Sequence, residues 1–381
     1  MKRVAIIGAG ISGLFIANLF RKNLNYQITI YEKNNLTDLD DGYGIQLSVN
    51  SIKLLNEIKF DGVQNKEKFT PEKINFYSNN ISNKICELNI SDFNIENCSY
   101  TTLKRSTLIN FLKKDLEDII KKGYSISKID QQNKQIKISF ENNVTSECDC
   151  LIISDGVFSK SKSLISNNQT SLRYNNTLAI RGTINKNFDN IDNQNISLFL
   201  GSNFHHVIYP VNSYGDLNFI AIMKYQLSVD EQKNYSLFTD NSFIEKVLDK
   251  TPSDIKEILN ILKEVKIFPI FVSKDFYKPL SSNIYLIGDA FFAFPPSFAQ
   301  GASQSIEAAY DLFKSIENNR ENEFFNKRVK KTKMVNNRSE FNQFVFHLSN
   351  PLITIIRNFF LKKLVKNKKF LESYLGKVYR N

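Results

Sequence analysis

The chain has 381 residues, of which 42% are hydrophobic and 31 are phenylalanine, which is enough to bury the cores of two lobes. No apolar run approaches the length that spans a bilayer, and the chain opens directly into a short apolar run, so we expect no signal peptide. Four cysteines without CxxC spacing and only three histidines argue against a metal site, so we expect a cytoplasmic protein without a bound metal.

The net charge of +11 comes from one end of the chain. From Arg320 to Asn381 there are fifteen Lys and Arg residues against four Asp and Glu residues, so the preceding part of the chain is balanced. We favour a solvated helical face as the interpretation of this basic segment, and peripheral contact with an acidic membrane surface is the alternative. The sequence holds no nucleic-acid-binding motif, so we expect no nucleic-acid partner.

The first predicted element is a strand, Val4 to Ile7, that runs into the pattern Gly8-x-Gly10-x-x-Gly13. A helix and a second apolar strand follow, and this strand ends on Glu32. Gly8 permits a tight turn, Gly10 lets a pyrophosphate approach the backbone, and Gly13 lets the helix pack close to the strand. The N-terminus of the helix then faces the phosphates, and Glu32 accepts hydrogen bonds from a ribose. The pattern predicts an adenine dinucleotide and serves NAD and FAD equally.

The elements that follow alternate between strands and helices. A helix is expected to start at Arg105 and to run to about Lys122, and Cys148 and Cys150 are expected on one face of a strand. From Ser303 the pattern is helical to the end of the chain. The predicted strands lie within residues 73–97, 124–129, 135–140, 150–153 and 284–287, and residues 172–270 are predicted mostly as β structure with one helix near 240–262.

Two further motifs follow predicted buried strands. Strand 150–153 leads into Asp155-Gly156, and strand 284–287 leads into Gly288-Asp289. With these three motifs in order, the chain resembles the FAD-dependent aromatic hydroxylases, the class A flavoprotein monooxygenases. The segment from Arg181-Gly182 through His206 to Pro210 looks like the salicylate hydroxylase and 6-hydroxynicotinate monooxygenase branch, and so, more weakly, does the tail around Arg338, His347 and Arg357.

The resemblance implies an α/β fold with a Rossmann-like FAD-binding domain, an inserted β-sheet substrate domain and a helical C-terminal segment. We expect residues 1–72, 98–171 and 281–330 to form the discontinuous FAD-binding domain. Residues 73–97 and 172–280 are expected to form the β-rich substrate domain. Residues 331–381 are the basic helical segment.

The resemblance also implies FAD as the cofactor and NAD(P)H as a transient co-substrate, because the chain has no second GxGxxG motif. Asp289 would accept from a ribitol hydroxyl, and the helix start at Gly301 and Ala302 would direct backbone N–H groups at the flavin pyrimidine edge. Arg105 matches the flavin-contacting arginine of the family. The full set of expected cofactor-binding residues is Gly8, Gly10, Ser12, Gly13, Glu32, Lys33, Arg105, Asp155, Gly156, Asp289, Gly301 and Ala302.

The reaction implied by the resemblance is hydroxylation of a phenol-like aromatic ring by a flavin C4a-hydroperoxide, formed with NAD(P)H and dioxygen. His206, Tyr209 and Arg181 are the candidates for polar contacts to the substrate, and Pro296 stiffens the loop over the flavin. Because neighbouring strand residues point to opposite faces, His205 and His206 cannot both reach the site. Each of these side chains has a structural alternative as a buried or solvated residue.

The substrate remains open at this level. A small aromatic acid fits the salicylate-like features, whereas a prenylated phenol fits the apolar loop and the basic tail. The family often has a histidine where this chain has Phe292. An FAD-dependent reductase or dehydrogenase of the same fold that does not oxygenate is the alternative function, and a non-catalytic FAD- or NAD-binding protein is the third.

Overall fold

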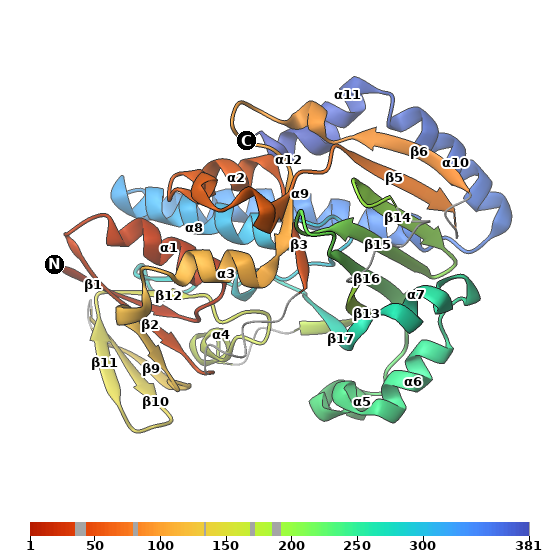
Figure 1. The fold of residues 1–381 in the computed structure, drawn as a ribbon. Helices are drawn as coiled ribbons and strands as arrows, with labels where there is room; N and C mark the ends of the chain where they lie inside the picture. Colours follow the sequence, from red (N-terminus) through yellow and green to blue (C-terminus); the bar gives the residue numbers. More distant parts are fainter. Residues whose placement is uncertain (35–42, 79–82, 133–134, 168–171, 185–191, 381) are drawn as a thin grey trace.

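The computed structural model describes residues 1–34, 43–78, 83–132, 135–167, 172–184 and 192–380. A parallel sheet of five strands, in the order β18-β12-β1-β2-β8, forms the centre of one lobe (Figure 1). Its strands are β1 Lys2–Ile7, β2 Tyr26–Glu32, β8 Ile120–Lys122, β12 Cys150–Ile153 and β18 Ile284–Leu286.

Both faces of this sheet are buried because apolar residues on its strands face both ways. Val4 and Ile6 of β1 pack into one hydrophobic cluster with four helices, whereas Ala5 and Ile7 pack into another with a three-stranded sheet. The four helices are α1 Ile11–Arg21, α2 Val49–Asn56, α3 Arg105–Lys113 and α8 Gly301–Glu317. The three-stranded sheet consists of β9 Ile126–Gln132, β10 Gln135–Phe140 and β11 Thr145–Cys148.

A seven-stranded sheet, in the order β17-β13-β16-β15-β14-β5-β6, forms the second lobe. All neighbours in it are antiparallel except β14 and β5, which are parallel. Its strands are β5 Lys73–Ser78, β6 Lys84–Asn89, β13 Leu172–Ile184, β14 Ile196–Gly201, β15 Phe204–Pro210, β16 Leu217–Lys224 and β17 Lys263–Ser273.

The two faces of the seven-stranded sheet meet different partners. One face packs on α6 Asn241–Asp249 and α7 Lys256–Ile261, with α5 Val229–Lys233 nearby (Figure 1). The other face packs on the C-terminal helices. A small sheet of β3 Gly44–Leu47, β7 Thr101–Lys104 and β4 Lys68–Phe69 completes the strands, and α4 Lys160–Ile165 follows β12.

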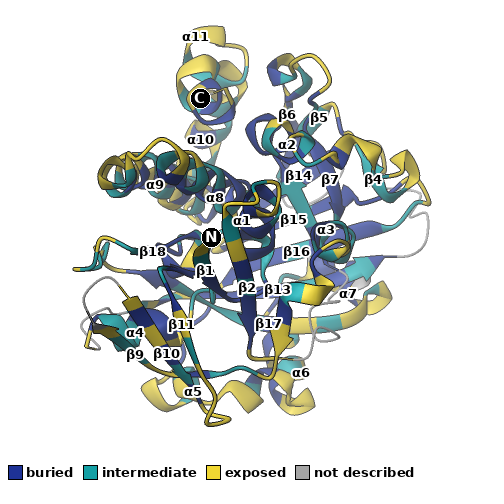
Figure 2. Cartoon of the chain, turned by 90° about the vertical axis from the view of Figure 1, so that its left-hand side faces the viewer, coloured by how far each residue is buried: buried dark blue, intermediate teal, exposed yellow. Residues whose placement is uncertain are grey.

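The C-terminal helices form a layer whose outer surface is widely exposed (Figure 2). They are α9 Glu321–Phe346, α10 Pro351–Leu364, α11 Lys368–Leu371 and α12 Lys377–Tyr379. The last of them turns inward, because Tyr379 is buried against Phe93 and Tyr100. Within the described ranges, no helix is long and apolar enough to cross a bilayer.

The predicted α/β fold class, with a parallel sheet, a separate β-sheet and a helical C-terminal region, is confirmed. Strands β5 and β6 share one sheet with β13 to β17. The exact domain boundaries stay a prediction, and α9 runs without a break through position 330.

Three local predictions are wrong. The helix that starts at Arg105 ends at Lys113, and residues up to Lys122 include β8, because Ile120 is buried beside β2. Cys148 ends β11 and Cys150 starts β12, so these side chains lie in different hydrophobic clusters. The helix near 240–262 is divided into α6 and α7 around Pro252, which cannot continue a helix.

Candidate active site

The glycines after β1 differ in the space around them. Gly8 has a φ of +101°, and a side chain there would place its Cβ 2.6 Å from the carbonyl oxygen of Ser154. A Cβ at Gly13 would lie 2.1 Å from the carbonyl oxygen of Gly8. At Gly10, the N-cap of α1, a Cβ would meet nothing within 4 Å. Gly8 and Gly13 therefore close the turn against the strand, and Gly10 leaves room for a ligand to approach the backbone.

Glu32 is bound to the same turn. Its carboxylate accepts from the backbone N–H of Ala9 at 2.8 Å and from that of Asn34 at 3.0 Å, and the side chain is 7% exposed. The acid at the end of β2 is thus held beside the glycine turn. Lys33, the next residue, is exposed.

The third motif lies against the first. A Cβ at Gly288 would lie 2.7 Å from the hydroxyl oxygen of Ser12, which is buried at the start of α1. Next to it, Asp289 faces open space, yet the surrounding protein raises the pKa of its carboxyl to about 6 by desolvation. The guanidinium of Arg105 opposes this rise in the pKa. Ser12, Asp289 and Arg105, which are far apart in the sequence, therefore lie close together.

The carboxylate of the second motif, Asp155-Gly156, forms its hydrogen bonds with residues that follow it closely in the chain. The carboxylate of Asp155 accepts from the hydroxyl of Ser159 at 2.5 Å and from the backbone N–H of Ser161 at 3.1 Å, at the start of α4. This is the structural role of a helix-capping acid. The backbone of Asp155 nevertheless borders the glycine turn, since a Cβ at Gly8 would lie 2.9 Å from its Cα. Gly156, with a φ of +83°, has open space at its Cβ position.

The loop before α8 is fixed by hydrogen bonds to α9. Ser339 donates its hydroxyl to the carbonyl oxygen of Pro295, and Asn342 donates to that of Ser297 at 3.1 Å. Ala299 takes a left-handed conformation with a φ of +50° and donates to the carbonyl oxygen of Pro296 at 2.9 Å. The loop ends at Gly301, which is exposed and has open space at its Cβ position.

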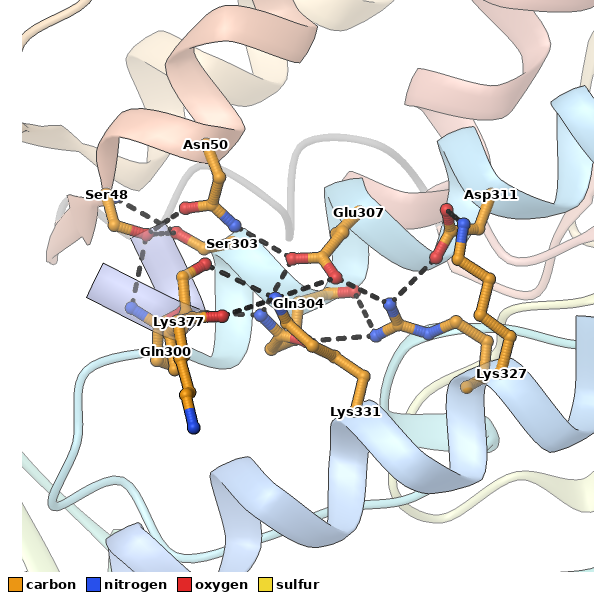
Figure 3. A network of polar contacts seen from close by, with 12 residues as sticks. Ser48, Asn50, Gln300, Ser303, Gln304, Glu307, Asp311, Lys327, Lys331 and Lys377 are labelled. Atoms are coloured by element: carbon orange, nitrogen blue, oxygen red, sulfur yellow. Dashed lines mark hydrogen bonds and ion pairs between the residues drawn. The ribbon is translucent and has the colours of Figure 1, made fainter. Parts of the chain in front are cut away.

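A buried polar network holds the N-terminal half of α8 in place (Figure 3). Gln300 donates to the hydroxyl of Ser48 at 3.1 Å, and Asn50 donates to the carboxylate of Glu307 at 2.8 Å. Arg328, which is 1% exposed, donates to Glu307 at 2.9 Å and to Gln304 at 3.0 Å. These contacts join α2 and α9 to α8, so the first turn of α8 has a defined position beside Asp289.

A cavity of about 730 Å³ extends from this region to the C-terminal helices. Most of its wall is apolar, and one row of it crosses four strands in register. The row consists of Leu198, Val207, Ile220 and Arg181. Asp289, Pro296 and Gly301 line one part of the cavity, and side chains of α10 line another.

The catalytic candidates from the sequence fall into two groups, because His206 and Tyr209 lie on opposite faces of β15. Tyr209 lines the cavity, as do Arg181 and Pro296, but His206 does not. His206 faces the opposite side, where its ring stacks on Phe199 at 4.3 Å and neither ring nitrogen has a partner among the described residues. Burial lowers the pKa of His206 to about 3. The structure therefore places His206 away from the other candidates.

His205 takes the place on the cavity face. Its Nδ1 lies 2.8 Å from Nε2 of His347, a residue of the loop after α9. Burial lowers the pKa of both rings, to about 4 for His347 and well below the usual value for His205. Both rings are therefore neutral at physiological pH and act as one hydrogen-bonded pair. Strand alternation allowed either histidine, and no feature of the sequence distinguished His205 from His206.

Burial raises the pKa of Tyr209, and Arg181 is the main group opposing that rise. The guanidinium of Arg181 lies 5.6 Å from the ring centroid of Tyr43. Of the phenylalanines in and before the loop that leads to α8, Phe294 and Phe298 line the cavity. The other two, Phe291 and Phe292, pack against Phe276 in the core behind the parallel sheet.

Arg357 of α10 also lines the cavity and is 7% exposed. Its Nε donates to the side chain of Asn358 at 3.0 Å, and a second nitrogen approaches the carbonyl oxygen of Val345 at 3.5 Å. No carboxylate of the described residues pairs with it, and burial lowers its pKa. A buried guanidinium in an apolar wall is suited to an anionic group of a bound molecule.

The chain is similar to known proteins over most of its length. Residues 6–37 match a family model described as an NAD(P)-binding Rossmann-like domain. The chain is 22% identical to 3-amino-4-hydroxybenzoate 2-monooxygenase PtnB3 of Streptomyces platensis, with 81% of this chain and 78% of that protein covered. It is also 22% identical to the salicylate hydroxylase of Pseudomonas putida, covering 84% and 77%. HpxO of Klebsiella pneumoniae, solved with FAD and uric acid, has the same fold with a TM-score of 0.85 at 14% identity, covering 99% and 96%.

Proposed function

We propose that this chain, which resembles the FAD-dependent aromatic hydroxylases in its motifs, its sequence and its fold, is an FAD-dependent monooxygenase of an aromatic substrate that uses NAD(P)H and dioxygen. One observation carries the proposal. The first and third motifs meet beside Arg105, and the space next to them continues into an apolar cavity. A groove with these two parts suits an extended dinucleotide whose reactive ring reaches a substrate.

The residues present fit FAD. Gly10 and Gly301 mark two open positions at the N-termini of α1 and α8, where helix dipoles favour negative charge. Glu32 would accept from the ribose and Asp289 from the ribitol chain. The other expected cofactor residues, Ser12, Lys33, Arg105, Asp155 and Ala302 among them, stay predictions of contact.

FAD would supply the redox chemistry with NAD(P)H and dioxygen. The apolar cavity wall excludes water from the reacting atoms, and the loop with Pro296 restricts access from one side. Tyr209 remains a neutral phenol, because burial raises its pKa, so it donates a hydrogen bond without adding charge. The neutral His205–His347 pair is available to form a hydrogen bond with a substrate hydroxyl, and Arg181 adds positive charge to the wall.

The proposed substrate is an aromatic compound that carries an anionic or phenolic oxygen. Arg357 supports this class, because binding an anion at its buried guanidinium would replace the carboxylate partner that it lacks among the described residues. As a finer part of the same proposal, the basic C-terminal segment touches a membrane surface peripherally. The apolar remainder of the cavity accommodates an alkyl or prenyl substituent.

The test is a screen of the purified protein for bound flavin and for substrate-stimulated NAD(P)H oxidation. Phenols and aromatic acids would be supplied in turn, with hydrogen peroxide and hydroxylated product measured separately. We expect a stoichiometric flavin and at least one compound that yields hydroxylated product. NAD(P)H oxidation without any oxygenated product would instead favour the non-oxygenating reductase, and a protein that cannot be loaded with FAD would refute the proposal.

Replacing Arg357 by methionine tests the substrate class. We expect KM for an anionic aromatic substrate to rise about 10- to 100-fold, since a hydrogen bond to a charged group contributes roughly 1.5–3 kcal/mol. The variant should fold normally, because it removes a buried charge. An unchanged KM for every anionic substrate would show that the anion is bound elsewhere.

A further inference from the structure

A row of large apolar side chains on α10 points away from the protein. Leu352, Ile355 and Phe359, which share one helix face at i, i+3 and i+7, are 72%, 66% and 53% exposed. Figure 1 shows α10 at the edge of the molecule, beside β6. Soluble proteins rarely expose a contiguous apolar patch of this kind unless it binds something.

A second row on the same helix borders the cavity. Ile353, Ile356 and Phe360 line the cavity and are nevertheless 45%, 55% and 55% exposed. Phe341, near the end of α9, also lines the cavity and is 56% exposed. These side chains therefore form an apolar rim between the cavity and the outside, directly beside the outer row of α10.

The charge around these rows has one sign. From Phe341 to Leu371 the chain has six basic residues and no acidic residue. Lys363 continues the outer row beyond Phe359, and its ammonium lies 4.5 Å from the centroid of that ring. Lys362, Lys366, Lys368 and Lys369 are exposed beside it. An apolar face flanked by lysines is typical of helices that lie in the boundary between lipid headgroups and acyl chains.

We propose that α10 docks on an anionic membrane surface and that the substrate enters the cavity from the bilayer across the apolar rim. The outer row would insert into the lipid boundary, and the lysines after Leu361 would contact lipid phosphates. A second copy of the chain is a poorer occupant, because a symmetric contact through α10 would bring two lysine clusters of the same sign together. The substrate part rests on the proposed function and deepens it: the aromatic substrate carries a lipid-soluble substituent.

The docking test uses the full chain and sedimentation with vesicles, without turnover. Wild-type protein should bind vesicles of phosphatidylcholine mixed with phosphatidylglycerol and bind phosphatidylcholine alone far more weakly. Replacing Leu352, Ile355 and Phe359 together by serine should weaken binding to the mixed vesicles at least a hundredfold. Replacing Lys362, Lys363 and Lys366 by glutamine should weaken it about a hundredfold, since each lysine near the surface contributes about 1 kcal/mol.

The matched control is Leu280→Ser, which removes a fully exposed leucine distant in sequence from α10 and should leave binding unchanged. Circular dichroism and the melting temperature should be unchanged in every variant, because all the replaced side chains are exposed. Failure of the wild-type protein to bind mixed vesicles, or equal binding by the serine variant, would overturn the proposal. A dimer in size-exclusion chromatography that the serine variant dissociates would also overturn it, in favour of a second copy.

The entry route is tested with two forms of one accepted phenol, a water-soluble form and a long-chain form embedded in vesicles. The serine variant should retain the rate on the soluble form and lose at least tenfold on the embedded form. An equal loss on both forms, or no loss on either, would overturn the route. If wild-type protein oxidises neither form, the proposed function fails, while the sedimentation result still decides the docking.

Discussion

The region around the parallel sheet and the region around the cavity are built differently. Around the parallel sheet, the polar groups of the proposed site lie in or next to turns that follow strands, as the backbone of Gly10 and the carboxylate of Asp289 do. Around the cavity, the polar partners come from distant segments, as His205 and His347 do. Local sequence determines the first kind of site, and tertiary packing determines the second. The predictions below test this difference, from the largest expected effect to the smallest.

Among the features that these predictions test, the buried polar network that holds the N-terminal half of α8 should contribute most to the free energy of unfolding. Arg328→Met leaves the buried carboxylate of Glu307 without its main charge partner, so we expect a loss of about 3–5 kcal/mol in the free energy of unfolding. The measurement is urea unfolding followed by circular dichroism. Lys327→Met, which removes an exposed lysine from its ion pair with Asp311, should cost no more than about 1 kcal/mol, because Asp311 keeps Arg328 as a partner. Equal losses in the two variants would contradict the proposed importance of the buried network.

The open space at Gly10 should matter for FAD and little for the fold. Gly10→Val should weaken FAD binding at least a hundredfold, because its side chain occupies the space left beside the turn, and should cost only about 1 kcal/mol of stability at this N-cap. Gly13→Val is the counterpart, and it should fail to fold because its Cβ would overlap the carbonyl oxygen of Gly8. Flavin titration and thermal unfolding distinguish the two. A valine at position 10 that still binds FAD tightly would place the dinucleotide elsewhere.

The buried histidines should make stability depend on pH. Their pKa values are lowered in the folded protein, so below about pH 6.5 the unfolded chain takes up protons that the folded chain does not. The contribution of these neutral histidines to the free energy of unfolding is fully present above about pH 6.5 and is lost as the pH falls toward about 4. His206→Leu should raise stability at pH 5 by about 2 kcal/mol, since one pKa unit corresponds to about 1.4 kcal/mol.

The same variant should leave any hydroxylation rate near the wild-type value, because His206 lies on the face of β15 away from the cavity. His205→Leu is the matched variant on the cavity face, and it should lower that rate. A large loss of turnover in His206→Leu would return His206 to the catalytic group.

Asp289 should give FAD binding a pH dependence of its own. Its pKa is raised to about 6, so its carboxylate becomes protonated as the pH falls through that value and loses acceptor capacity for a ribitol hydroxyl. FAD affinity should fall about tenfold between pH 7 and pH 5, as one pH unit below the pKa implies. Asp289→Asn should bind weakly without this slope, whereas Asp155→Asn, which alters the cap of α4, should keep it.

The parallel sheet and the glycine turn could be predicted, because each depends on a few adjacent residues with a known backbone geometry. The meeting of Asp289 with Arg105 was implied only by the resemblance to the aromatic hydroxylases, since these residues lie far apart in the chain. The sequence could not predict which face of β15 lines the cavity, because apolar residues surround both His205 and His206 and the sheet is covered on both sides. The pairing of Arg328 with Glu307 was also missed. Its residues lie on two helices, and α9 shows no apolar stripe that would reveal its buried face.

The inward turn of α12 has a practical consequence. Val378 and Tyr379 fill a pocket beside Phe93 and Tyr100, and Lys331 donates to the carbonyl oxygen of Val378 at 3.4 Å. Trimming the chain before Val378 would leave those aromatic rings facing water and invite aggregation. Purification handles and fluorescent reporters therefore belong at Met1, which is 88% exposed.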